Sequence, residues 1–240
     1  MPGTAEMYRW DIVVPAGRYI FAVEDGEVVE FNETGDDPAD RFNRYQSIKP
    51  SHPVHGMITW PNTVLLRGPV TAIVDPGLVT QGPPLLLGME RLGVDPESVD
   101  LVINTHHHVD HCHANCYFPG ATGVIHKFEY YQYTSDYRLG YEPPELRLLE
   151  GRWGTIAPGL KFVLTPGHTV GSICIVAKVA EGNLVLAGDT IGPLPEYFST
   201  MKPPHDMPNR KELIDSWWRI RDTEPAIIVP GHNPPMVPSV

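Results

Sequence analysis

The segment NTHHHVDHCHAN, residues 104–115, contains five of the chain's 11 histidines and one aspartate. It overlaps the end of LVINT, residues 101–105, an apolar and β-branched run that predicts a buried strand. In an extended chain, residues i and i+2 point to the same side, so His106 and His108 can converge while His107 points away. The segment alone leaves two interpretations open, a metal site and a solvated histidine-rich turn.

A helix is expected to begin after the strand, over residues 109–114, and it would place Asp110 and His111 in its first turn. Side chains there can face a second point close to the one that His106 and His108 face. The pattern therefore permits two adjacent coordination centres.

Three further strand-like runs each end in one potential metal ligand. His168 ends the run VLTPGH, Asp189 ends LVLAGD, and His232 ends IIVPGH. Imidazole nitrogen and carboxylate oxygen are the usual ligands of zinc and similar metals, and a cation offsets the cost of burying such groups. The repetition of this arrangement in one chain favours the metal site over the histidine-rich turn.

This series of motifs resembles the complete ligand pattern of the metallo-β-lactamase superfamily. H-x-H-x-D-H is followed by the histidine of PGHT-x-GS, the aspartate of GDT and the histidine of PGH, and the likeness covers residues 70–232. It includes the VDPG turn with Asp75 and Gly77. The resemblance implies an α/β fold, a four-layer αββα sandwich, with metals at one rim between two sheets. It also implies one domain over residues 1–240.

The resemblance further implies two divalent metal ions, zinc first, with iron or manganese as alternatives. Asp189 would bridge the two ions, and Asp110 would be both a ligand and a catalytic group that orients or relays a proton; pure ligation by Asp110 is the alternative. The implied ligands are His106, His108 and His168 for one ion, and Asp110, His111 and His232 for the other.

The expected activity is hydrolysis of a small-molecule carboxylic ester, lactone or thioester by a metal-bridging hydroxide. The sequence contains no G-x-S-x-G motif for a serine nucleophile. An aspartate at position 189 departs from lactamases that use cysteine there, and the few residues after His232 leave no room for the C-terminal helices of glyoxalase II. Hydrolysis of a phosphodiester or phosphotriester is the alternative. An iron-dependent dioxygenase and a metalloprotein without turnover are less favoured, because all seven ligands are present.

The rest of the chain predicts β-rich segments with interleaved helices. Runs at 56–60 and 62–68 are expected to form a hairpin, and residues 85–94 and 209–222 are expected to be helices. A loop insertion is predicted at about 33–55, and a second, proline-rich active-site loop at about 191–208. Residues in or near these loops are candidates for substrate binding: His52, His55, Tyr197 and His205.

Composition limits the partners. The formal net charge of −11 argues against nucleic-acid binding, and no apolar run is long enough to span a membrane. The three cysteines have no disulfide-framework spacing, and together with the lack of a signal-peptide pattern they favour a cytoplasmic location. Cys112 and Cys116 are expected to pack in the core. Residues 130–133 (YYQY) are expected to pack internally or to form a subunit contact, so a homodimer is one expectation.

Overall fold

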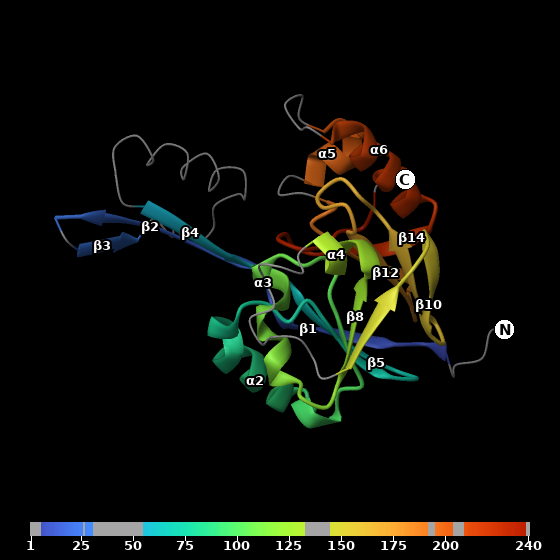
Figure 1. Cartoon of the computed structure of the whole chain (residues 1–240), viewed down its shortest axis with the longest axis horizontal. Coiled ribbons are helices and arrows are strands. Elements are labelled where there is room, and N and C mark those ends of the chain that lie inside the picture. Colours follow the sequence, from blue (N-terminus) through green and yellow to red (C-terminus); the bar gives the residue numbers. More distant parts are fainter. Residues whose placement is uncertain are drawn as a thin grey trace.

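Two stacked β-sheets form the body of the protein, and a third sheet stands outside them (Figure 1). The computed structural model describes residues 6–25, 27–30, 55–132, 145–191, 195–203 and 209–238. The first sheet has the strand order β1-β5-β6-β7-β8-β9 and the second has the order β10-β11-β12-β13-β14. The strands of the first sheet are β1 (Arg9–Val14), β5 (Thr63–Arg67), β6 (Thr71–Val74), β7 (Leu101–Ile103), β8 (Thr122–His126) and β9 (Glu145–Leu149).

The second sheet packs face to face on the first. Its strands are β10 (Trp153–Ala157), β11 (Leu160–Leu164), β12 (Ile173–Val179), β13 (Gly182–Gly188) and β14 (Pro225–Pro230).

Side chains that alternate between the two faces of a strand let each sheet contribute to two hydrophobic cores, one on each face. On β5, Val64 and Leu66 belong to the core between the two sheets, whereas Leu65 belongs to a second core behind the first sheet. On β12, Ile173 lies in the central core and Cys174 lies in a third core behind the second sheet. Successive side chains of a strand point to opposite faces. Strands covered on both faces therefore read as the continuous apolar runs seen in the sequence.

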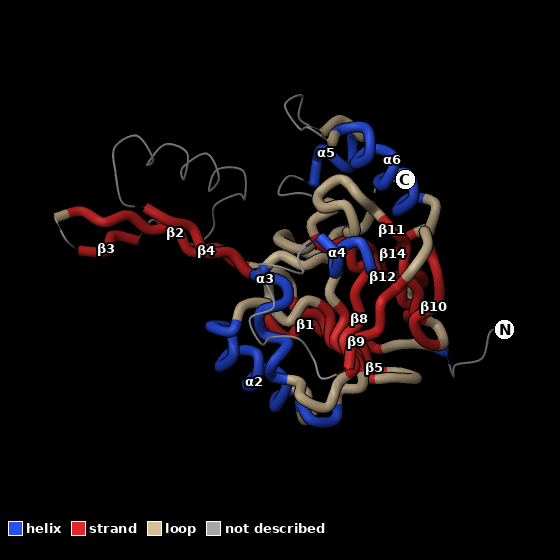
Figure 2. Tube along the Cα trace, viewed as in Figure 1, coloured by secondary structure: helices blue, strands red, loops and turns tan. Residues whose placement is uncertain are grey.

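Helices cover the outer faces of both sheets (Figure 2). Leu85 and Met89 of α2 (Gly82–Arg91) contribute to the core behind the first sheet. Trp217 of α6 (Arg210–Arg221) contributes to the core behind the second sheet. The result is the predicted four-layer αββα sandwich. The remaining helices are α3 (Val109–Cys112), α4 (Lys127–Gln132) and α5 (Pro195–Thr200), with 3-10 turns η2 (Val79–Gln81), η3 (Pro96–Ser98) and η4 (His113–Tyr117).

Both predicted long helices form, with shifted ends. The first begins at Gly82, three residues earlier than predicted, because prolines are compatible with the first turn of a helix. It ends before Gly93, which has a positive φ of 67° that suits glycine after a helix. In α6, Leu213, Trp217 and Ile220 recur at helical spacing on the buried face.

The third sheet forms an arm that projects from the sandwich (Figure 1). It consists of β2 (Gly17–Glu24) between β3 (Glu27–Glu30) and β4 (His55–Trp60). Residues 31–54 lie outside the described part of the chain, so most of the predicted loop at 33–55 does as well. Its last residue, His55, begins β4 instead of ending a loop.

The predicted hairpin between residues 56–60 and 62–68 is wrong. β4 pairs with β2, whereas β5 pairs with β1 and β6 in a different sheet. Between them, buried Asn62 donates to the carbonyls of Pro230 and Asn233 and accepts from the backbone N–H of Ala16. These contacts carry the chain from one sheet into another, and Pro61-Asn62 lacks the glycine that favours a tight hairpin turn.

The predicted proline-rich loop at 191–208 contains a short helix, α5, which covers the second sheet with Phe198. Residues 192–194 and 204–208 of that segment lie outside the described part. Within the described ranges, no helix is both long enough and apolar enough to cross a bilayer.

Candidate metal centre

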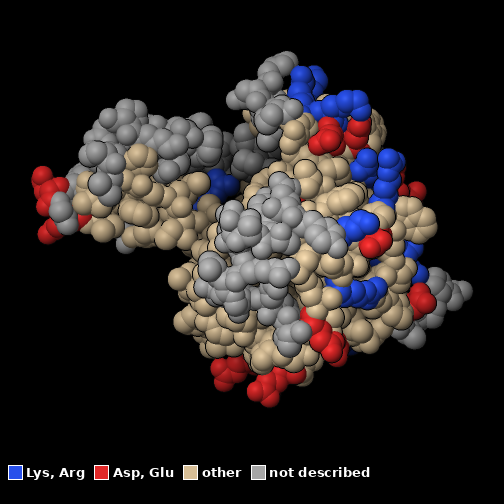
Figure 3. All heavy atoms as spheres, in the orientation of Figure 1, with Lys and Arg blue, Asp and Glu red and all other residues tan. Residues whose placement is uncertain are grey.

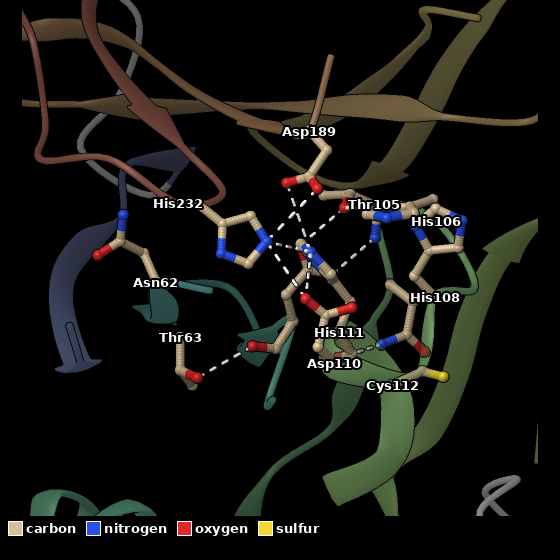
Figure 4. Close-up of polar contacts among 12 residues, drawn as sticks. Asn62, Thr63, Thr105, His106, His108, Asp110, His111, Cys112, Asp189 and His232 are labelled. Atoms are coloured by element: carbon tan, nitrogen blue, oxygen red, sulfur yellow. Dashed lines mark hydrogen bonds and ion pairs between the residues drawn. The ribbon is translucent and has the colours of Figure 1, made fainter. Parts of the chain in front are cut away.

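Seven histidine and aspartate side chains meet at one rim of the sandwich, where strands from both sheets end (Figure 4). The first sheet supplies four of them through the segment after β7 and helix α3, and the second sheet supplies three from the ends of β11, β13 and β14. Residues far apart in the chain meet because the strands of the two stacked sheets end at one rim. The seven residues are His106, His108, Asp110, His111, His168, Asp189 and His232.

Two glycines beside these residues explain part of the local sequence. Gly167 precedes His168 and has a φ of 136°, in the positive region that glycine adopts readily. A Cβ at Gly231, which precedes His232, would collide with Asp189 Oδ1. The glycine of each PGH motif therefore allows the ligand turn to form or to approach its neighbours closely.

One group of potential ligands consists of His106, His108 and His168, whose ligand atoms lie within 4.8 Å of one another. His168 Nε2 lies 3.0 Å from His108 Nδ1. Thr105 Oγ1 lies 3.1 Å from His106 Nδ1, which leaves Nε2 of that ring to face the group. That nitrogen is buried and has no hydrogen-bond partner among the described residues.

A second group consists of Asp110, His111 and His232, again with ligand atoms within 4.8 Å of one another. His232 Nε2 lies 3.3 Å from His111 Nε2 and 3.3 Å from Asp110 Oδ2. Thr59 of β4 donates from Oγ1 to Asp110 Oδ2 over 2.9 Å, so the base of the arm touches this group.

Asp189 lies between the two groups. Its Oδ2 is 3.5 Å from His168 Nε2 of the first group and 3.4 Å from His232 Nε2 of the second. Its Oδ1 is 3.4 Å from His111 Nε2. One carboxylate therefore reaches histidines of both groups, as a bridging ligand would.

The donor set fits divalent cations. Zinc, iron and manganese ions are bound by imidazole nitrogens and carboxylate oxygens. The site offers imidazole nitrogens that face one another, a buried nitrogen without a hydrogen bond among the described residues, and a carboxylate shared between the two groups. His106, His108 and His168 would hold one ion, Asp110, His111 and His232 a second, and Asp189 would contact both.

The two groups differ electrostatically. Burial lowers the pKa of His106 well below the usual histidine value, and neighbouring His111 lowers it further. Burial also lowers the pKa of His168, despite the opposing effect of Asp189. Neutral imidazole is the form that binds a metal, so these two histidines are ready to ligate at neutral pH.

Histidines of the second group have raised pKa values. Burial acts to lower the pKa of His111, but the carboxylates of Asp189 and Asp75 outweigh it and raise that pKa well above the usual value. Burial likewise acts to lower the pKa of His232, but Asp189 and Asp110 outweigh it and raise that pKa to about 9. For Asp189, burial acts to raise the pKa, but His232 and His111 hold it well below the usual value.

Asp75 supports the second group from behind. Its Oδ2 lies 2.9 Å from His111 Nδ1 and accepts a hydrogen bond of 2.6 Å from Thr105 Oγ1, while Oδ1 accepts one of 2.8 Å from Thr105 N–H. A carboxylate on the far nitrogen of a ligand histidine fixes the ring's orientation and its tautomer. The sequence marked Asp75 as part of the VDPG turn but gave it no role in the site.

Glu129 is a supporting residue that no sequence motif identified. It lies on α4, is fully buried, and its carboxylate accepts hydrogen bonds from the N–H groups of His107 (2.9 Å) and Gly171 (2.8 Å). These two amides belong to the segments that carry His108 and His168. Glu129 therefore connects the segment of His108, which follows the first sheet, with the segment of His168, which follows a strand of the second sheet.

Other predicted residues lie elsewhere. The described ligand groups include neither His107 nor His113, the two remaining histidines of the segment at residues 104–115. Cys112 is buried, and burial raises the pKa of its thiol to about 12. Cys116 is exposed, so its predicted core packing is wrong; α3 ends at Cys112, and the 3-10 turn that follows directs residue 116 outward.

The candidate substrate-binding residues lie in different parts of the chain. His55 lies on the arm, paired with Ala22, four residues along β4 from Thr59. Tyr197 on α5 packs against the core behind the second sheet. His52 and His205 lie outside the described residues.

Comparison with known proteins assigns the family. A family model described as the metallo-beta-lactamase superfamily matches residues 62–232. This chain belongs to the metallo-beta-lactamase superfamily. The matched region contains all seven residues of the centre.

Proteins with similar sequences include a probable metallo-hydrolase of Methanocaldococcus jannaschii, 29% identical over 62% of this chain and 64% of that protein. Metallo-beta-lactamase domain-containing protein 1 of Xenopus laevis is 32% identical over 72% of this chain and 71% of its own. The N-acyl homoserine lactonase AttM of Azorhizobium caulinodans is 27% identical over 69% and 67%. The matched regions thus span about two thirds of these relatives' lengths.

Solved structures show the same superfamily fold. The structure of a protein named a putative metallo-beta-lactamase, from Thermotoga maritima, superimposes with a TM-score of 0.65 at 18% identity, over 97% of this chain and all of that one. A quorum-quenching N-acyl homoserine lactone lactonase superimposes with a TM-score of 0.66 at 20% identity, over 97% and 94%.

Proposed function

We propose that this protein is a metal-dependent hydrolase of a small-molecule carboxylic ester, lactone or thioester, with two divalent cations at the rim of the sandwich. The observation that carries the proposal is the placement of Asp189 between two three-residue ligand groups. Relatives named as metallo-hydrolases and N-acyl homoserine lactonases support the reaction class, and favour an ester-type bond over a phosphoester.

Zinc, the expected metal, would supply Lewis acidity toward the scissile carbonyl and would lower the pKa of a coordinated water to about 7. The chain's own residues supply the remaining requirements. Asp189 balances positive charge shared between the two groups, and the side chains of His106 and His111 are fully buried beside it.

Asp110 is the residue best placed to hold a proton during turnover. Its pKa is lowered, because hydrogen bonding to His232 and the charge of His111 outweigh the effect of burial. The carboxylate is therefore ionised at neutral pH and can accept a proton. Its side chain remains 19% exposed, and the Thr59 hydroxyl fixes Oδ2. Oδ1 is thus the oxygen left to orient or receive the proton.

Metal analysis combined with a substrate panel tests the proposal. Protein stripped with a chelator and reloaded with zinc would be assayed on activated esters, lactones, thioesters and phosphoesters. We expect metal-dependent turnover of at least one ester-type substrate, and little on phosphoesters. Binding of a single iron with oxygen uptake and no hydrolysis would contradict the proposal and favour a dioxygenase.

A further inference from the structure

A cavity of about 340 Å³ opens beside the second ligand group. His232 forms part of its wall, so the cavity adjoins the metal centre. Its volume falls in the range of small-molecule sites, which are mostly apolar with a few placed polar groups. The other lining residues that matter here are Ile12, Pro15, Arg18, Asn62 and Pro234.

Arg18 is the one lysine or arginine among the residues that line this cavity. It lies near the base of the arm on β2, directly opposite Thr59 of β4. Residues directly opposite each other in an antiparallel pair project to the same face of the sheet. Thr59 donates to Asp110 from that face, so the strand register independently places Arg18 on the side of the metal centre.

The surroundings make this positive charge distinctive. The chain carries a formal net charge of −11, and the arm's tip is acidic, with exposed Asp25 and Glu27 (Figure 3). Among the described residues of the arm's three strands, Arg18 is the one cationic side chain. On the described part of the arm, an anionic group that enters the cavity therefore meets this guanidinium as its positive charge.

We propose that the cavity holds the part of the substrate remote from the scissile bond, and that Arg18 pairs there with a substrate carboxylate. The preferred substrates are then esters or lactones that carry a carboxylate. A guanidinium binds a carboxylate through two parallel hydrogen bonds, and its single positive charge balances the single negative charge of that carboxylate. This inference rests on the proposed function for the ester or lactone bond that is cleaved. The binding of a carboxylate by Arg18 does not depend on it.

Two matched esters test the inference: 4-nitrophenyl hexanoate and mono-4-nitrophenyl adipate, which differ in a terminal carboxylate. Zinc-loaded protein should favour the adipate ester in kcat/KM. Arg18→Gln should reduce this adipate-to-hexanoate ratio by about 10- to 100-fold, mainly through KM. Arg18→Lys should retain part of the preference, because it keeps the charge but loses the paired hydrogen bonds.

Lys161→Gln is the matched control, since Lys161 is exposed on β11 and lines a different cavity. It removes the same unit charge and should leave the ratio unchanged. An equal loss in this variant would show a long-range charge effect and overturn the inference, as would an unchanged ratio in Arg18→Gln.

Calorimetric binding of free adipate and hexanoate gives a readout without turnover. Both acids can contact the metals through one carboxylate, and adipate has a second for Arg18. Adipate that binds more tightly than hexanoate, with this advantage lost in Arg18→Gln, supports the inference. It does so even when neither ester is hydrolysed, because a lack of hydrolysis would count only against the proposed function. Equal affinity of the two acids for the unmodified protein overturns it.

Discussion

The carboxylate of Asp75 and the ring of His111 form a buried pair, with Oδ2 2.9 Å from Nδ1. The pair joins the turn after β6 to helix α3, which carries two of the potential metal ligands. It leaves His111 Nε2 directed at Asp189 and His232. The orientation of His111 in the second ligand group thus depends on a residue on the far side of its ring from the other ligands.

Asp75→Asn should weaken metal binding at the second group by about 10- to 100-fold, because the amide is a poorer partner for the imidazole N–H. Zinc titration with a competing chelator measures this. Asp100→Asn is the matched control: Asp100 Oδ2 also accepts a backbone hydrogen bond, from Thr71, but far from the centre. Equal zinc affinity in both variants would rule out the supporting role of Asp75.

Glu129→Gln should destabilise the fold by about 1–3 kcal/mol. The carboxylate accepts hydrogen bonds from two backbone N–H groups, and in the variant one of them would face the side-chain NH₂ group of glutamine. The loss should be larger in zinc-loaded protein, since the same amides hold the segments of His108 and His168. Urea unfolding with and without zinc measures both values. Exposed Glu97→Gln serves as the control, and an identical loss in both forms would show that Glu129 acts only on the fold.

Acidification should empty the second group before the first. A histidine with a raised pKa keeps its proton to higher pH, so protons compete with metal there sooner as pH falls. For His232 this competition begins near its pKa of about 9, and His111 is raised as well, whereas the pKa values of His106 and His168 are lowered. Zinc content after dialysis over a pH series should fall in two steps. A single step would contradict the electrostatic difference between the groups.

Variants of adjacent histidines should behave differently. His106→Ala removes a ligand of the first group whose ligand atom also lies within 4.8 Å of those of His111 and Asp189, so most bound metal and activity should be lost. His107→Ala and His113→Ala should each stay within about 10-fold of the unmodified protein in zinc affinity. Should His107→Ala prove as damaging as His106→Ala, the ligand assignment in this stretch is mistaken.

The fold was predictable because its signals are local. Apolar runs such as LVINT and LVLAGD predicted the strands, and the resemblance of the motif series at their ends to the metallo-β-lactamase superfamily implied the four-layer sandwich. The alternation that separates His106 from His107 is also local. In the structure, the rings of His106 and His108 lie close together, with centroids 4.6 Å apart.

Long-range pairing was not predictable. Nothing in GMITW shows that it pairs with β2 instead of the next strand, since that choice depends on buried Asn62 and the carbonyls it meets. Glu129 and Thr59 were missed for a similar reason. Each contacts the centre from an element whose own sequence carries no metal-ligand pattern, and only the packing of that element brings it there.

The bridging role of Asp189 is tested most directly by the zinc content of Asp189→Asn beside that of the unmodified protein, measured by mass spectrometry on folded, zinc-loaded samples. We expect about two zinc ions per unmodified chain and a substantial loss of both in the variant, because one shared negative charge is removed. Full zinc content and full turnover in Asp189→Asn would contradict a carboxylate shared by two metal ions.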